Sequence, residues 1–197
     1  NVTKFYNSKG IITHALKNIN LELYKNEFVA ICGPSGSGKS TLLNVICKQD
    51  TFDEGEIYYK GNETAYFNVD DMDDFRKNKV GFIFQNYNII ESYTVFQNVM
   101  LPYELKGIPT KEAKKKALAI IDDVGLHDKI NNRGAELSGG QKQRCVIARA
   151  LAFEPEILAC DEPTGNLDSE TGAEIMALIA KIAHDKLVLV VTHNYEE

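Results

Sequence analysis

The sequence predicts a single α/β domain built on a largely parallel sheet. Three short apolar runs, at residues 27–32, 157–160 and 187–192, have the length and composition of strands. The first is almost continuously apolar, so we expect it to be buried on both faces. Amphipathic helical spacing lies between the other two, at residues 175–182. Strands that alternate with such helices are typical of parallel sheets, because the crossover helices cover the sheet faces.

Further elements extend this core. Residues 16–23 alternate apolar and polar side chains in a two-residue period, which predicts a strand, and residues 56–59 and 80–84 are further strand candidates. Between residues 86 and 136 the pattern contains two helical segments and no good strand. One of these segments has apolar residues at helical spacing around residues 117–124. We therefore expect a helical subdomain that interrupts the α/β core.

Composition narrows the class of protein. The chain has 197 residues, 44% of them hydrophobic, which is enough for one domain with a sizeable core. A net charge of −6 argues against a broad nucleic-acid-binding face. The longest aliphatic stretch, residues 187–191, is too short to cross a bilayer, and no export signal is visible, so we expect a cytoplasmic location. The last strand runs almost to residue 197, so elements that finish the fold are expected to be missing.

The four cysteines lack the paired spacing of a zinc site, and each lies among aliphatic residues. We expect buried free thiols at Cys32, Cys47, Cys145 and Cys160.

Residues 33–41, GPSGSGKST, have the spacing of a phosphate-binding loop between a strand and an apolar helix. Glycines allow such a loop to fold into a nest of backbone N–H groups at a helix N-terminus, where anions bind. Lys39 is expected to reach the β- and γ-phosphates, and Ser40 to give its hydroxyl to Mg²⁺. The alternative, an ordinary glycine-rich turn, does not account for strand, helix and spacing together. The predicted ATP contacts are Gly33, Pro34, Ser35, Gly36, Ser37, Gly38, Lys39, Ser40 and Thr41.

Two adjacent carboxylates, Asp161 and Glu162, end the strand at residues 157–160. Ligands of open α/β sheets bind at the carboxyl ends of the strands. We expect Asp161 to hold the magnesium shell and Glu162 to polarise the attacking water as a general base. Taken alone, the pair could equally be a helix cap or a surface pair; the phosphate loop makes the catalytic interpretation the stronger one.

Residues 137–141, LSGGQ, open a second apolar helix. Ser138 and the amides of Gly139 and Gly140, followed by Gln141, offer an anion site at a helix N-terminus without a phosphate-loop lysine. A chain with two unlike γ-phosphate sites suggests that one serves a neighbouring molecule. A plain serine N-cap is the alternative if the pentapeptide is taken alone.

Together, these motifs resemble an ATP-binding-cassette (ABC) ATPase over essentially the whole chain. The resemblance implies that Gln85 contacts magnesium and senses a transmembrane partner, that Asp168 lies in a loop at a dimer interface, and that His193 is the switch histidine at the γ-phosphate. It also implies that Tyr6 stacks on adenine, although a strand aromatic is more often a core residue and Phe5 is adjacent. One departure is Gly134, where a proline is expected before LSGGQ.

The resemblance is strongest to the branch of lipoprotein-release and macrolide or antimicrobial-peptide exporters, to which cell-division relatives also belong. It implies a P-loop NTPase core at residues 1–85 and 138–197 with an N-terminal antiparallel β subdomain, and a helical subdomain at residues 86–137. The implied function is Mg-ATP hydrolysis in a head-to-tail homodimer at the cytoplasmic face of the membrane, coupled to transmembrane permease partners, with no nucleic-acid partner. A non-transport ABC ATPase of DNA repair, translation or cell division is the alternative.

Overall fold

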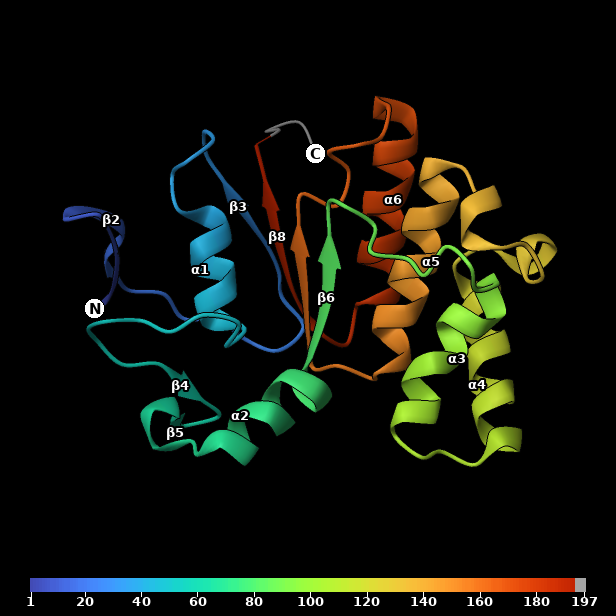
Figure 1. Ribbon diagram of the computed structural model, residues 1–197, viewed down its shortest axis with the longest axis horizontal. Helices are drawn as coiled ribbons and strands as arrows, with labels where there is room; N and C mark the ends of the chain where they lie inside the picture. Colours follow the sequence, from blue (N-terminus) through green and yellow to red (C-terminus); the bar gives the residue numbers. More distant parts are fainter. Residues whose placement is uncertain (194–197) are drawn as a thin grey trace.

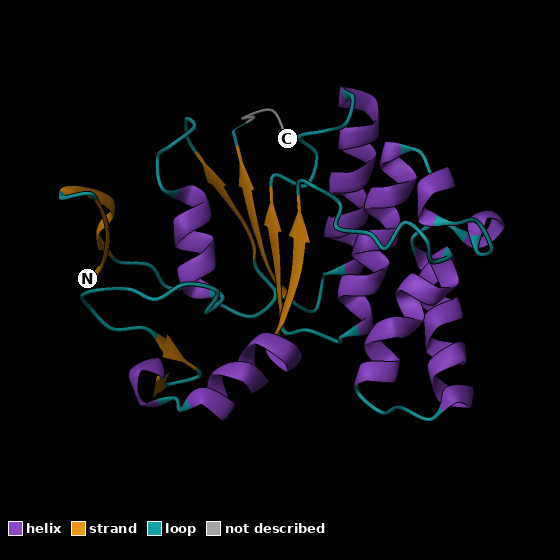
Figure 2. Ribbon diagram, viewed as in Figure 1, coloured by secondary structure: helices purple, strands orange, loops and turns teal. Residues whose placement is uncertain are grey.

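The centre of the fold is a four-stranded parallel sheet with the strand order β3-β8-β7-β6. The computed structural model describes residues 1–193. All four arrows point toward the same edge (Figure 2), so the loops that follow the strands lie together at that edge. The strands are β3 (Phe28–Cys32), β6 (Val80–Phe84), β7 (Ile157–Asp161) and β8 (Leu187–Thr192).

The position of each strand in the sheet decides its burial. All six residues of β8 are buried, because β8 pairs with β3 on one side and β7 on the other. The expectation that residues 27–32 are buried on both faces is wrong: β3 alternates exposed and partly buried residues, and Phe28 is 44% exposed. Within the described residues β3 pairs only with β8, so it is an edge strand.

Three of the four cysteines are buried. Cys47, Cys145 and Cys160 are buried free thiols as expected, but Cys32, at the end of the edge strand β3, is exposed. Burial raises the pKa of Cys47 and of Cys145 to about 12, so both thiols stay protonated near neutral pH. The three buried cysteines therefore act as small apolar packing residues.

Helices cover the sheet on both sides. Figure 1 shows α1 (Lys39–Ile46) on one side, with α5 (Gly139–Ala152) and α6 (Ser169–Ile182) on the other. Leu43 of α1 packs in one apolar cluster with Leu189 of β8, while Ile179 of α6 belongs to a second, larger cluster. The predicted α/β class with its parallel sheet is confirmed.

The predicted helical insertion contains α3 (Val95–Leu105) and α4 (Thr110–Asp123). Thr94 caps α3 with a capping box, in which its hydroxyl accepts from the Gln97 N–H and the Gln97 side chain accepts from the Thr94 N–H. The apolar face of α4, which includes Ala117, belongs to the same core cluster as residues of α5 and α6. Helix α5 therefore packs against both the insertion and the sheet.

Of the remaining elements, β2 (Ile11–Ile19) lies beside α1, whereas β4 (Tyr58–Tyr59), β5 (Asn62–Glu63) and α2 (Val69–Asp74) lie below it in the view of Figure 1. Strand β2 forms the antiparallel pair with β1 (Val2–Ser8), and β4 pairs with β5 before α2 and a π-helical turn, Phe75–Lys79. The strand predicted at 16–23 is displaced: β2 begins at Ile11 and ends at Ile19, so only its last four residues fall in the predicted range. The strand predicted at 56–59 is longer than β4, whose ladder includes only two residues. Among the described residues, no helix is long and apolar enough to cross a membrane.

Candidate nucleotide site

The phosphate loop joins β3 to α1 at the sheet edge where the strands end. Two of its glycines have positive φ, 77° at Gly36 and 91° at Gly38, a region that residues with a side chain seldom adopt. A Cβ on Gly38 would lie 2.3 Å from the backbone oxygen of Ala15 in β2. The loop therefore needs glycine there for two reasons: the left-handed backbone and the close approach of the N-terminal β pair.

Lys39 is the first residue of α1 and is buried, with 8% of its surface exposed. Its Nζ donates to the carbonyl oxygens of Gly33 (2.8 Å) and Pro34 (2.9 Å), so the ammonium lies across the loop. The side chain thus points back over the nest of backbone amides instead of into solvent. That is the position from which a lysine can meet phosphate oxygens held by the loop.

Ser40 and Asp161 meet although 121 positions separate them in the chain. The Ser40 hydroxyl donates to Asp161 Oδ1 at 2.9 Å and joins the start of α1 to the end of β7. Burial raises the pKa of Asp161, an effect that the Ser40 hydrogen bond opposes. A half-buried carboxylate beside a hydroxyl is a pair of hard oxygen ligands that fits Mg²⁺.

No cluster of three or more His, Cys, Asp or Glu side chains able to hold a metal occurs in residues 1–193.

Glu162 follows β7 in a left-handed conformation, with φ at 49°. Its N–H donates to Val191 of β8 at 2.9 Å, and its carbonyl accepts from the Gly165 N–H at 3.2 Å. Its carboxylate Oε1 lies 3.2 Å from Nδ1 of His193, the residue directly after β8. The predicted base and switch histidine are therefore neighbours at the edge that carries the phosphate loop.

Gln85 and the segment around Asn166 contact each other. The Asn166 side-chain amide donates to the Gln85 carbonyl at 2.9 Å, and a Cβ on Gly165 would lie 2.7 Å from Gln85 Nε2. Asp168 caps α6: its carboxylate accepts from the Thr171 N–H (3.0 Å) and hydroxyl (2.8 Å), which lowers the pKa of Asp168. Asp168 is thus the N-cap of α6, while its interface role stays a prediction.

The signature segment, residues 137–141, begins α5. Ser138 is the N-cap, with its hydroxyl accepting from the Gln141 N–H at 3.4 Å and the Gln141 side chain accepting from the Ser138 N–H at 3.0 Å. Gly140 is pressed onto α6, since a Cβ there would lie 2.6 Å from Thr171 Cγ2. Within residues 1–193, no hydrogen bond joins this segment to the phosphate loop of the same chain.

Tyr6 lies on β1 and is 43% exposed. Its hydroxyl donates to Asp50 Oδ2 at 2.6 Å, which raises the pKa of Tyr6, while the Thr41 hydroxyl acts in the opposite direction. The ring is therefore near the first turn of α1, and Lys4 Nζ lies 5.0 Å from its centroid. The exposed ring is compatible with adenine stacking, which remains a prediction.

The contacts of Gly134 explain why this position does not carry the expected proline. Its N–H donates to the Tyr93 carbonyl at 2.9 Å, and a Cβ would lie 3.0 Å from Glu91 Cα. A proline has no N–H and could not make this hydrogen bond. Backbone hydrogen bonding, and not a proline ring, therefore holds the loop at this position.

Sequence reasoning missed Gln143 of α5, which is fully buried and donates from Nε2 to the carbonyl of Pro163 at 2.7 Å. The signal was available as one polar residue on the otherwise apolar buried face of the helix.

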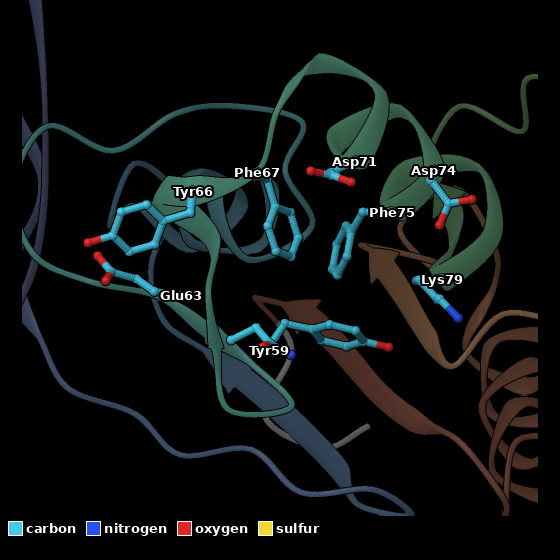
Figure 3. A pocket seen from close by; sticks show the side chains of 9 residues that line it. Tyr59, Glu63, Tyr66, Phe67, Asp71, Asp74, Phe75 and Lys79 are labelled. Carbon is cyan, nitrogen blue, oxygen red and sulfur yellow. The ribbon is translucent and has the colours of Figure 1, made fainter.

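A separate hollow of about 390 Å³ lies between β5 and α2 and includes none of the predicted site residues. Figure 3 shows the rings of Tyr59, Phe67 and Phe75 in this hollow, with Asp71 and Asp74 on α2 beside them. Tyr59 and Phe75 make an edge-on contact with centroids 4.9 Å apart. These rings pack the β4–β5 segment against the end of the sheet.

Comparison with known proteins identifies the family of the chain. The pattern of the family described as ABC transporter matches residues 16–165. The ABC transporter ATP-binding protein MJ0796 of Methanocaldococcus jannaschii is 45% identical over 98% of this chain and 85% of its own length. The lipoprotein-releasing system ATP-binding protein LolD of Rickettsia conorii is 38% identical over 100% of this chain and 87% of its own length.

Two other kinds of similarity are informative. The macrolide export ATP-binding/permease protein MacB of Nitrobacter winogradskyi is 40% identical over 98% of this chain, which spans 30% of that protein. The dimeric structure of MJ0796 superposes with a TM-score of 0.87, covering 100% of this chain and 87% of that one at 44% identity. A post-hydrolysis dimer of MJ0796 bound to ADP and Pi gives a TM-score of 0.86. The chain therefore belongs to the ABC transporter family, as an ATP-binding and ATP-hydrolysing domain of the branch that includes LolD and MacB.

Proposed function

We propose that the chain binds Mg-ATP between its own phosphate loop and the signature segment of a second copy, and hydrolyses it there. The observation that carries this proposal is the division of the site. Lys39, Asp161 and Glu162 converge at one sheet edge, while Ser138 begins a different helix and, in the part of the chain that the structure describes, makes no hydrogen bond to that edge. A second copy supplies the missing half. The dimeric structures of the related MJ0796 support this arrangement.

The residues divide the chemistry as follows. The loop amides and Lys39 bind the phosphates, and Ser40, Asp161 and Gln85 hold Mg²⁺. When bound, Mg²⁺ would supply the positive charge that offsets the charge of the phosphates. Glu162 accepts the proton of the attacking water, and His193, whose ring nitrogen lies 3.2 Å from the Glu162 carboxylate, orients that carboxylate toward the γ-phosphate.

We further propose that the domain works at the cytoplasmic face of a membrane through a permease partner. Support comes from the relative named as an ATP-binding/permease protein and from the relative named as part of a lipoprotein-releasing system. The insertion that carries α3 and α4 is the proposed contact, with Gln85 as the residue that reports on the partner. The non-transport alternative gains no support from these relatives, which are transporter components by name.

The shared site is tested by mixing two inactive chains. Lys39→Ala removes the lysine of the phosphate loop, and Ser138→Ala removes the signature hydroxyl; each homodimer should be inactive. A heterodimer retains one complete site, so ATPase activity should return on mixing once the chains exchange.

Thr94→Ala is the matched control for Ser138→Ala. Thr94 caps α3 with the same kind of capping box, so its loss costs a similar amount, about 1 kcal/mol, without touching nucleotide. This variant should keep full activity. If mixtures stay inactive while labelled chains demonstrably form heterodimers, the shared-site proposal is wrong.

Glu162→Gln tests the base and the dimer together. It should slow hydrolysis by about 10²–10⁴-fold and leave ATP binding intact, because the amide keeps the shape of the carboxylate but not its basicity. Size exclusion should then give a dimer with ATP and a monomer without it. Hydrolysis at the wild-type rate would move the base elsewhere, whereas slow hydrolysis with no dimer would remove only the head-to-tail arrangement.

A further inference from the structure

The buried side chain of Gln143 is an energetically unfavourable feature of the core. Its surface exposure is 0%, and its amide Nε2 donates to the Pro163 carbonyl at 2.7 Å. Its amide oxygen Oε1 is the one buried side-chain N or O atom in residues 1–193 that has no hydrogen-bond partner. A buried acceptor without a partner costs free energy, so a half-satisfied glutamine is a poor choice for stability alone.

The buried residues near Gln143 on the same helix are apolar. Cys145, Val146 and Ile147 follow it on α5 and are all buried apolar residues of the larger core cluster. A methionine would fill the same volume without a polar atom to satisfy. Residues that break a local rule in this way are expected where function requires them.

The partner of Gln143 is the loop that carries Glu162. Glu162 has a left-handed backbone, which costs free energy and persists only where the surroundings hold it. Its own N–H and carbonyl are held by Val191 and Gly165. Pro163, the next residue, has no N–H, so its carbonyl is the backbone group through which the loop can be anchored at that position. Gln143 provides that anchor.

The position of Gln143 along α5 also connects its contact with Pro163 to the signature segment. The same helix begins at Ser138, the residue that the proposed function places on the nucleotide of the partner copy. One rigid helix thus connects the signature segment of one composite site to the Glu162 loop of the other. Displacement of α5 when its N-terminus meets a phosphate would reach the Pro163 carbonyl through a single hydrogen bond.

We infer that Gln143 is a positioning residue for Glu162, which couples the signature helix of each chain to the catalytic loop of the same chain. The inference rests on the proposed function, because it assumes that Glu162 is the base and that Ser138 acts on the partner nucleotide. Gln143 itself touches neither substrate nor ion; it acts through the Pro163 carbonyl.

Gln143→Met removes the donor and the unpartnered acceptor while keeping the volume. The kcat should fall about 10- to 100-fold, because a misplaced catalytic group costs that much, whereas KM and ATP affinity should stay within about two-fold. The melting temperature should stay equal or rise, since the unpartnered acceptor is gone. Cys145→Ala is the matched control: it removes a buried group from the same helix, and should lower the melting temperature with kcat unchanged.

Gln143→Glu gives an independent readout and serves if Gln143→Met does not fold. A buried carboxyl is neutral at low pH and then still has an O–H to donate to Pro163. The ratio of its kcat to that of wild type should therefore fall as pH rises from about 6 to about 9. A ratio that is flat across this range would overturn the inference.

A double-mutant cycle separates this inference from the proposed function. If Gln143 acts through Glu162, adding Gln143→Met to Glu162→Gln should not slow the residual rate further. Additive losses would overturn the positioning role, as would a Gln143→Met protein with wild-type kcat. Failure of the proposed function has a different signature: Glu162→Gln alone would then hydrolyse ATP at the wild-type rate.

Discussion

The phosphate loop offers a matched pair of glycines that tests its structure. Gly36 and Gly38 both have positive φ, yet a Cβ on Gly36 would meet nothing within 4 Å, whereas one on Gly38 would lie 2.3 Å from the Ala15 carbonyl oxygen. Gly36→Ala and Gly38→Ala therefore carry the same kind of backbone penalty and differ in the collision. The difference between the two variants isolates the contact between the loop and β2.

The magnitudes follow from these distances. The left-handed backbone costs an alanine about 1–2 kcal/mol, so Gly36→Ala should lose that much stability and at most about ten-fold in ATP affinity. In Gly38→Ala the backbone must also retreat by about 1 Å to restore ordinary contact with Ala15. Overpacking against backbone adds about 1–3 kcal/mol, and a displaced loop no longer aims its amides. We expect a loss of about 2–5 kcal/mol in stability and about 100-fold or more in ATP affinity.

Urea unfolding and titration with a fluorescent ATP analogue measure the two quantities. Equal losses in both variants would mean that β2 does not press on the loop at Gly38. A Gly38→Ala protein that binds ATP like wild type would contradict the described loop altogether.

Three further predictions concern charge and stacking. Burial lowers the pKa of Lys48 to about 8. Between that value and the higher pKa of the unfolded chain, the unfolded state binds more protons, so stability rises with pH by about 3 kcal/mol. Lys48→Met should remove this rise in urea unfolding, and an unchanged pH slope would contradict the prediction. The Lys60 ammonium, more than any other neighbour, lowers the pKa of Glu156 to about 2; the stabilisation is present above about pH 4.5 and is lost as pH falls toward 2. Because Glu156 is about one-third exposed, Glu156→Gln should cost only about 1 kcal/mol in urea unfolding near neutral pH, and most of that cost should be gone at pH 2. Tyr6→Phe should keep ATP affinity and Tyr6→Ala should lose about ten-fold if the ring stacks on adenine; equal affinities would assign Tyr6 to packing alone.

Much of the site was predictable because its motifs are local. The phosphate loop, LSGGQ and the strand that ends in Asp161 each occupy a few consecutive residues, and their backbone requirements can be seen in the residue types themselves. Glycine at positions 36 and 38 predicts positive φ, and Ser138 before two glycines predicts a helix start. These features depend on neighbours in the chain, so a single sequence is enough to predict them.

Tertiary structure decided what depends on the strand order. The same kind of apolar run is an exposed edge at β3 and a fully buried strand at β8, because only the order β3-β8-β7-β6 places one at the border and the other inside. The hydrogen bond from Ser40 to Asp161 joins residues 121 positions apart, and the Gln143 amide of α5 reaches the Pro163 carbonyl in the loop after β7. Such pairs form when packing brings separate elements within about 3 Å, and the local pattern of neither partner encodes that approach.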